Sequence, residues 1–221
     1  MKAGSSLAVA LCLAGLCAGA RADDAVRLDG LAAVVGGTAP SPGVDAILQS
    51  DVELRARITL AGHGADPRRS EPMTDALLRA TLLEIIGEHL IAREARRVQA
   101  GTPSAADLNQ ERTRLVRAVG GAERMRALLT ALSADDEELD AIARRRALVG
   151  AFLAANLEGI TVVTDSEVQA ALAADPDAGA DTPAVRGEIR ARLSREALDH
   201  TIARWVTVLR ARTPLRVFVA Y

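Results

Sequence analysis

Residues 74–100 read TDALLRATLLEIIGEHLIAREARRVQA, and this segment predicts the central element of the fold. Its leucines and isoleucines repeat at helical spacing, but they cover more than one narrow stripe. Gly101 follows directly as a stop signal. Because a helix that is apolar on several sides must be contacted from several sides, we expect a long central helix within a mainly α-helical fold.

Further helices are predicted on both sides of the central one. Two pairs have the spacing of a helix-capping box, Ser50 with Glu53 and Ser104 with Asp107. The apolar stripe of the last helix changes phase, so we expect a bend or a restart near Ser194. The expected helices, besides the central one, lie over about 50–60, 104–119, 125–132, 133–159, 164–174 and 183–212.

Three short stretches predict β-strands. Leu28–Val35 is apolar and ends at a glycine pair, Ala46–Leu48 follows a loop, and Leu215–Ala220 follows Pro214. A strand at the end of the chain must pair with something, because its backbone groups need hydrogen-bond partners. The N-terminal strands are the evident partners, so we expect a small antiparallel sheet in which both ends of the mature chain meet.

The start of the chain has the pattern of a secretion signal. It combines the basic residue Lys2, an apolar stretch over 7–16 and a small residue at Ala20. We expect residues 1–20 to be a signal peptide removed on export. Cleavage after Ala22 satisfies the same small-residue rule and remains an alternative.

The leader also decides the expected location and redox chemistry. Cys17 follows Leu16, whereas a lipidated cysteine usually follows a small residue, so we do not expect a lipoprotein. No later stretch has the roughly 18 consecutive apolar residues needed to cross a bilayer, so we expect a soluble periplasmic protein. Both cysteines, Cys12 and Cys17, lie in the leader, which leaves the mature chain without a disulfide.

Composition excludes several functions. The only lysine, Lys2, and both cysteines lie in the leader, so the mature chain has no P-loop lysine, no Schiff base and no cysteine nucleophile. Over the full sequence 27 basic residues nearly balance 29 acidic ones, which argues against nucleic-acid binding by charge. With one Trp, one Tyr and two Phe in the chain, base stacking is also not expected.

Searches for catalytic or metal-binding patterns return no site. His63, His89 and His200 are not spaced as metal ligands. The acidic run 135–138 fits the first turn of a helix, where negative charge is favourable. The stretch 175–181 lacks the ligands of a calcium loop. We therefore expect no catalytic residue, no cofactor and no metal.

The order of these elements, with several local strings, resembles the SurA N-terminal chaperone domain of parvulin-type foldases. The resemblance covers nearly all of the mature chain, although each string by itself is degenerate. The strings are LDGLAAVVG at 28–36, ILQSDV at 47–52, LLEII at 82–86 with LI at 90–91, TVVTDSEV at 161–168, and the closing helix and strand over 188–219.

One departure from that family is large. In the foldases an isomerase domain of roughly a hundred residues separates the short helix from the closing helix, and here only a short linker does. The resemblance implies a helical domain over 21–174, a linker over 175–182, and a closing helix and strand over 183–221 that pack back on the first part. It implies a chaperone that holds unfolded polypeptides, and it argues against isomerase activity.

We therefore expect an ATP-independent periplasmic chaperone that binds unfolded or extended polypeptides, in particular outer-membrane proteins. The alternatives are a dedicated adaptor or subunit of an envelope or export complex and a residual peptidyl-prolyl isomerase. A holding protein needs an apolar groove that it does not fill itself. The candidates for such a groove are Met125, Leu129, Phe152 and Trp205, and each of them has core packing as its alternative.

Overall fold

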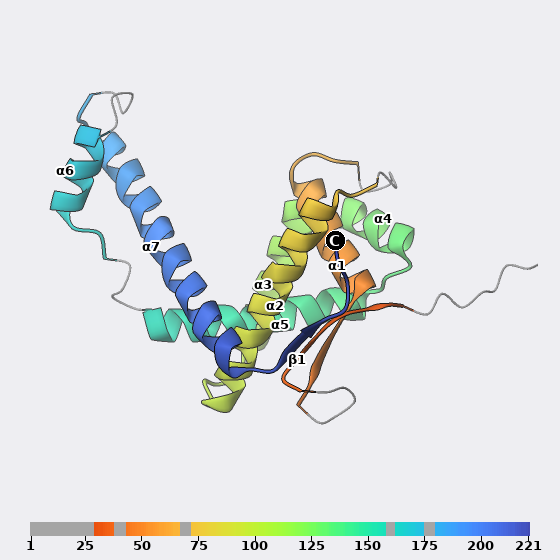
Figure 1. Cartoon of the computed structure of the whole chain (residues 1–221). Coiled ribbons are helices and arrows are strands. Elements are labelled where there is room, and N and C mark those ends of the chain that lie inside the picture. The colour runs from red at the N-terminus through yellow and green to blue at the C-terminus, as the bar shows by residue number, and fades with distance from the viewer. Residues whose placement is uncertain (1–28, 38–42, 67–71, 158–161, 175–179) are drawn as a thin grey trace, which may run out of the picture.

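The structure of the chain is a computed structural model that describes residues 29–37, 43–66, 72–157, 162–174 and 180–221 (Figure 1). It confirms a mainly helical fold with one small antiparallel sheet. The elements are β1 (Leu31–Val35), β2 (Asp45–Leu48), α1 (Gln49–Gly62), α2 (Asp75–Arg97), α3 (Ala105–Val119), α4 (Ala122–Leu132), α5 (Asp136–Leu157), α6 (Asp165–Ala174), α7 (Pro183–Arg212) and β3 (Leu215–Val217).

Helix α2 is the central helix of the body, as its sequence predicts. It contacts α1, α5 and α7 as well as both strands β1 and β2. Ile85, Ile86 and Leu90 on α2 are all buried, because neighbours cover more than one side of the helix. The helix ends at Arg97, three residues short of the predicted end at Ala100. In the segment that follows, Gln99 adopts a positive φ of 52°.

The two ends of the described chain meet in the sheet, which has the strand order β2-β1-β3 with antiparallel pairing throughout. Val34 lies opposite Arg216. On either side of this pair, Gly36 N donates to Pro214 O at 2.8 Å and Phe218 N donates to Ala32 O at 2.9 Å. The expected pairing of the last strand with the first is therefore confirmed.

The body contains two clusters of buried apolar side chains. The main cluster joins β1, β2, α2, the end of α5 and the end of α7. The second cluster joins α1, α3 and α4 with the beginning of α5. Helices α1 and α5 therefore connect the two clusters, since α1 also contributes Val52 to the main one.

Helix α7 runs without interruption for 30 residues, so no restart occurs at Ser194. Its second half packs on the main cluster through Ile202, Trp205 and Leu209. Its first half lies against α6, and together these two helices project from the body as an arm (Figure 1). The stripe changes phase because the helix changes its packing partner along its length.

The start of α1 differs from the expected capping box of Ser50 and Glu53. The helix begins one residue earlier, at Gln49, and the carboxylate of Asp51 accepts a hydrogen bond of 2.8 Å from Leu48 N. Ser50 instead donates from its backbone to Asp29 at 3.2 Å. Strand β2 leads directly into the helix, so the capping position falls on the last strand residue.

The start of α5 also differs from the prediction. Ser133 does not open this helix: it is the C-cap of α4, with a φ of 54°. The side chain of Asp135 instead accepts hydrogen bonds from the backbone of Glu137 and Glu138, at 2.8 and 3.0 Å. The expected capping box at Ser104 is confirmed, and so is the expected helix start near 164, where Thr164 accepts from Glu167 N; the expected end of the preceding helix at 159 lies outside the described residues.

Glu94 of α2 holds the end of α7 in place. Its carboxylate accepts two hydrogen bonds of 2.8 Å from Arg97 and lies 2.7 Å from Arg212 Nη2. The hydrogen bonds from Arg97, together with the guanidinium of Arg212, lower the pKa of Glu94 to about 2 against the opposing effect of burial. Helix α7 is thereby fixed to α2 just before the chain enters β3.

Replacing Glu94 with glutamine is expected to lower the free energy of unfolding at pH 7 by about 1 kcal/mol, because solvent screens the half-exposed arginines. Folding lowers the pKa of this carboxyl from its ordinary 4.5, so its stabilising effect is full above that value and fades as the pH falls toward 2. Urea unfolding of both proteins at pH 7, 4 and 3 measures the difference. A difference that stays constant over this range would contradict the assignment.

Candidate functional site

The four groove residues predicted from the sequence do not lie together. Met125 and Leu129 are buried in the second cluster, where α4 faces α1 and α3. Phe152 is buried in the main cluster, and Trp205 is partly buried against it. The rings of Phe152 and Trp205 have centroids 5.4 Å apart and an interplanar angle of 49°.

In this structure Met125, Leu129 and Phe152 are core residues, because the helices opposite each stripe cover them. Trp205 joins α7 to the body. Client binding by these four residues therefore stays a prediction, and other residues offer more exposed candidates for a site.

Strand β3 offers such a site at the edge of the sheet. Among the described residues, β3 has β1 as its only strand neighbour. Arg216 pairs with Val34, so its backbone groups face β1. Because backbone groups alternate in direction along a strand, those of Leu215 and Val217 point away from the sheet. In the described part of the chain no strand covers this side of β3, so these groups are placed to pair with an added strand.

The same edge also exposes apolar side chains. Val217 is 47% exposed and its neighbour Phe218 is 55% exposed. The other exposed large apolar residues of the described chain have no such adjacent partner; they are Leu48, Leu83, Val98, Val162 and Val208. The sequence predicts the strand. Which of its side chains face solvent depends on how the strand packs against the helices, and a local sequence pattern does not show this packing.

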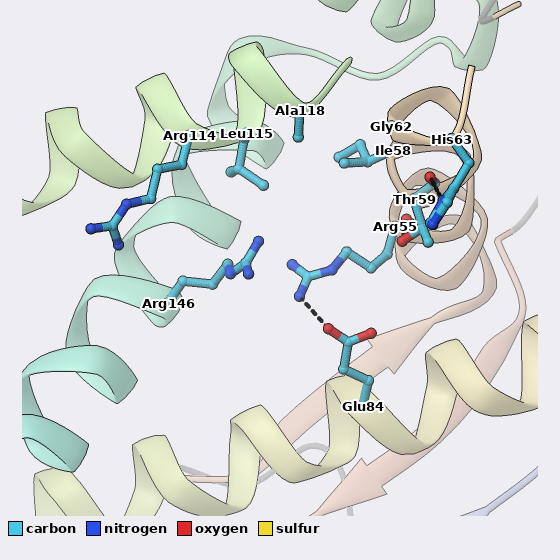
Figure 2. A pocket seen from close by; sticks show the side chains of 10 residues that line it. All are labelled: Arg55, Ile58, Thr59, Gly62, His63, Glu84, Arg114, Leu115, Ala118 and Arg146. Carbon is cyan, nitrogen blue, oxygen red and sulfur yellow. Dashed lines mark hydrogen bonds and ion pairs between the residues drawn. The ribbon is translucent and has the colours of Figure 1, made fainter. Parts of the chain in front are cut away.

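A second candidate is an open pocket of about 380 Å³ between α1, α2, α3 and α5 (Figure 2). The figure shows the guanidinium groups of Arg55 and Arg146 pointing toward one another across it. Arg114 and His63 also lie at the pocket, and Glu84 is its one acidic lining residue. The remaining lining residues are Ile58, Thr59, Gly62, Leu115 and Ala118.

An ionic cluster centred on the buried Arg55 shares Arg55, Glu84 and Arg146 with the lining of this pocket. Arg55 is 3% exposed and donates from Nη2 to Glu84, at 3.1 Å, and to Glu88. Glu88 is 13% exposed and is also approached by Arg145 at 3.4 Å and by Arg146 at 3.9 Å. An arginine on a helix is ordinarily exposed, and no sequence pattern marks Arg55 as buried.

The histidines are separated in the structure. His63 is exposed at the end of α1, where its Nδ1 lies 2.8 Å from Thr59 O. His89 is buried, with Nδ1 3.7 Å from Asp45, and His200 is exposed on α7. The contact between His89 and Asp45 joins α2 to β2, and no local sequence pattern predicts it.

The described residues contain no group of three or more His, Cys, Asp or Glu side chains placed to hold a metal ion. In the acidic run 135–138, Asp136 forms an ion pair of 2.5 Å with Arg112, and Asp135 caps α5. The stretch 175–179, which superficially resembles a calcium loop, lies outside the described residues.

The described part of the chain has no helix that is long and apolar enough to cross a membrane. Against known proteins, the sequence matches no protein-family model and no curated protein sequence.

Proposed function

We propose that the protein is an ATP-independent, chaperone-like protein that holds unfolded or extended polypeptides at the outer edge of β3. The observation that carries the proposal is the outer edge of this strand, which no other described strand covers, with Val217 and Phe218 exposed beside it. The sequence supports the same proposal through its predicted export signal and through its resemblance to the SurA N-terminal chaperone domain.

An extended client binds such an edge by adding a strand. Its backbone pairs with the outward groups of Leu215 and Val217, which requires no particular client sequence. Phe218 adds apolar contact with alternate client side chains. The edge is short, so affinity stays modest, on the order of micromolar or about 8 kcal/mol, and release needs no nucleotide.

Outer-membrane proteins in the periplasm are the clients that we propose. Their strands alternate apolar and polar residues over about ten positions, so an unfolded one presents many segments that are able to pair with an edge. Arg216 lies between the two outward-facing backbone positions, and its charge disfavours edge-to-edge pairing of two copies of this chain.

Two changes at the edge are expected to weaken client holding about tenfold. Val217→Pro removes an outward N–H without touching the bonds to β1, and Phe218→Ser removes exposed apolar surface worth roughly 1–2 kcal/mol. The measurement is suppression of aggregation of an urea-unfolded outer-membrane barrel protein upon dilution, at increasing ratios of chaperone to client.

The matched control is Val162→Ser, which removes an even more exposed valine, 73% exposed, from the segment before α6. This variant should suppress aggregation as the unchanged protein does. Equal losses in all three variants, or no suppression by the unchanged protein, would contradict the proposal. Co-purification of one stoichiometric partner in place of many clients would favour a dedicated adaptor.

A further inference from the structure

We propose that the pocket between α1, α3 and α5 binds a carboxylate carried on a short apolar group, with Arg55 and Arg146 as the donors. The site is separate from the β3 edge, and the argument for it does not depend on the holding function. It rests on an incompletely paired buried guanidinium, on an excess of positive charge and on an apolar wall.

The first argument is the hydrogen bonding of Arg55. Both of its ion pairs, with Glu84 and with Glu88, are made through Nη2. Its Nη1 is buried and has no hydrogen-bond partner among the described residues. A buried donor without a partner is unfavourable, and one on a charged group is more so. Because Arg55 lines the pocket, an acceptor bound there would satisfy this donor.

The second argument is the local charge. The guanidinium groups of Arg55, Arg145 and Arg146 all approach the single carboxylate of Glu88. Glu84 adds a second carboxylate, which still leaves one positive charge in excess. The site is partly shielded from solvent, where a charge interacts more strongly than in water. An anion is therefore the ligand that this site favours.

The third argument is the opposite wall of the pocket. Ile58 of α1 and Leu115 and Ala118 of α3 line it on the side away from Glu84 (Figure 2). Gly62 keeps α1 close to α3: a Cβ at this position would lie 3.2 Å from Ala118 O. The volume of about 380 Å³ accommodates a group the size of one amino-acid side chain next to the anion.

These features together select a carboxylate with an apolar substituent. Its oxygens would accept from Arg55 Nη1 and from the guanidinium of Arg146, which matches the planar geometry of arginine donors. The substituent would lie against Ile58 and Leu115. Two sources share this chemistry, namely a free small carboxylic acid and the C-terminal residue of a peptide.

The test is calorimetric titration of the full mature chain with N-acetyl-leucine and with N-acetyl-leucinamide, which differ only in the anionic group. We expect the acid to bind at least tenfold more tightly than the amide. Equal binding of the two, or tighter binding of inorganic phosphate than of the acid, would overturn the proposal. Peptides ending in leucine then distinguish the sources: tighter binding than N-acetyl-leucine assigns the site to a chain end, and weaker binding assigns it to a small acid.

Matched variants on α5 locate the binding. Arg146→Gln removes a donor that is partly exposed and that lies 3.9 Å from Glu88, the longest of the three arginine distances to this carboxylate. The fold should therefore tolerate the change, and binding should fall about tenfold or more. Arg144→Gln removes the same charge from an exposed arginine that lines another surface, and binding should stay unchanged. Equal losses in both variants would show non-specific attraction and overturn the site.

Discussion

Replacing Glu88 with glutamine is expected to lower the free energy of unfolding by about 3 kcal/mol. The change keeps the size of the side chain but removes the one carboxylate that Arg55, Arg145 and Arg146 share. Arg55 is almost fully buried and would keep only Glu84, whose side chain is 54% exposed, as a carboxylate partner; removing the buried partner of a buried charge is strongly destabilising. Urea unfolding followed by circular dichroism measures the loss.

Glu84→Gln is the matched control. Glu84 contacts the same guanidinium of Arg55 at 3.1 Å, but its side chain is 54% exposed, so we expect a loss of less than about 1 kcal/mol. Equal losses in the two variants would show that Glu88 has no special role. A Glu88→Gln protein as stable as the unchanged one would show that the ionic cluster does not stabilise the fold. It would also weaken the argument for the pocket beside the cluster.

Replacing Phe152 with alanine is expected to cost about 3 to 5 kcal/mol, the usual range for removing a buried aromatic ring. Phe152 is on α5 and Trp205 is on α7, and the centroids of their rings are 5.4 Å apart. The loss should loosen the docking of α7 on the body. Since Trp205 is the only tryptophan of the chain, its fluorescence reports directly on that contact.

The measurements are urea unfolding and the emission maximum of Trp205 in the folded protein, which should shift to longer wavelength in Phe152→Ala. The control is the other phenylalanine of the chain: Phe218→Ala alters an exposed ring and should change stability by less than about 1 kcal/mol. An unchanged emission maximum in Phe152→Ala would contradict the packing of α7 described above.

Much of the fold follows from the sequence because strong local signals agree with the tertiary arrangement. The helix over 75–97 needs neighbours on several sides, and the strand at 215–217 needs a partner. The helix starts at 50 and 133 were predicted less well, because other groups compete for these positions. Asp29 binds Ser50 from another segment, and Ser133 ends the preceding helix.

The candidate sites were harder to predict, for a physical reason. Met125 and Phe152 have the residue types of an adaptable groove, but whether such residues are covered depends on which helix lies opposite. A usable signal for the ionic cluster does exist in the sequence. Glu84 and Glu88 are four residues apart on one face of the central helix, so burial of that face requires cationic partners from elsewhere.

The pairing of Val34 with Arg216 has a consequence for biogenesis, since these residues are about 180 positions apart in the chain. During synthesis, β1 keeps one side unpaired with β3 until residues 215–217 have been translated. Contacts of such high sequence separation form late and slow the folding reaction. The polypeptide is therefore expected to stay incompletely folded until β3 can dock on β1.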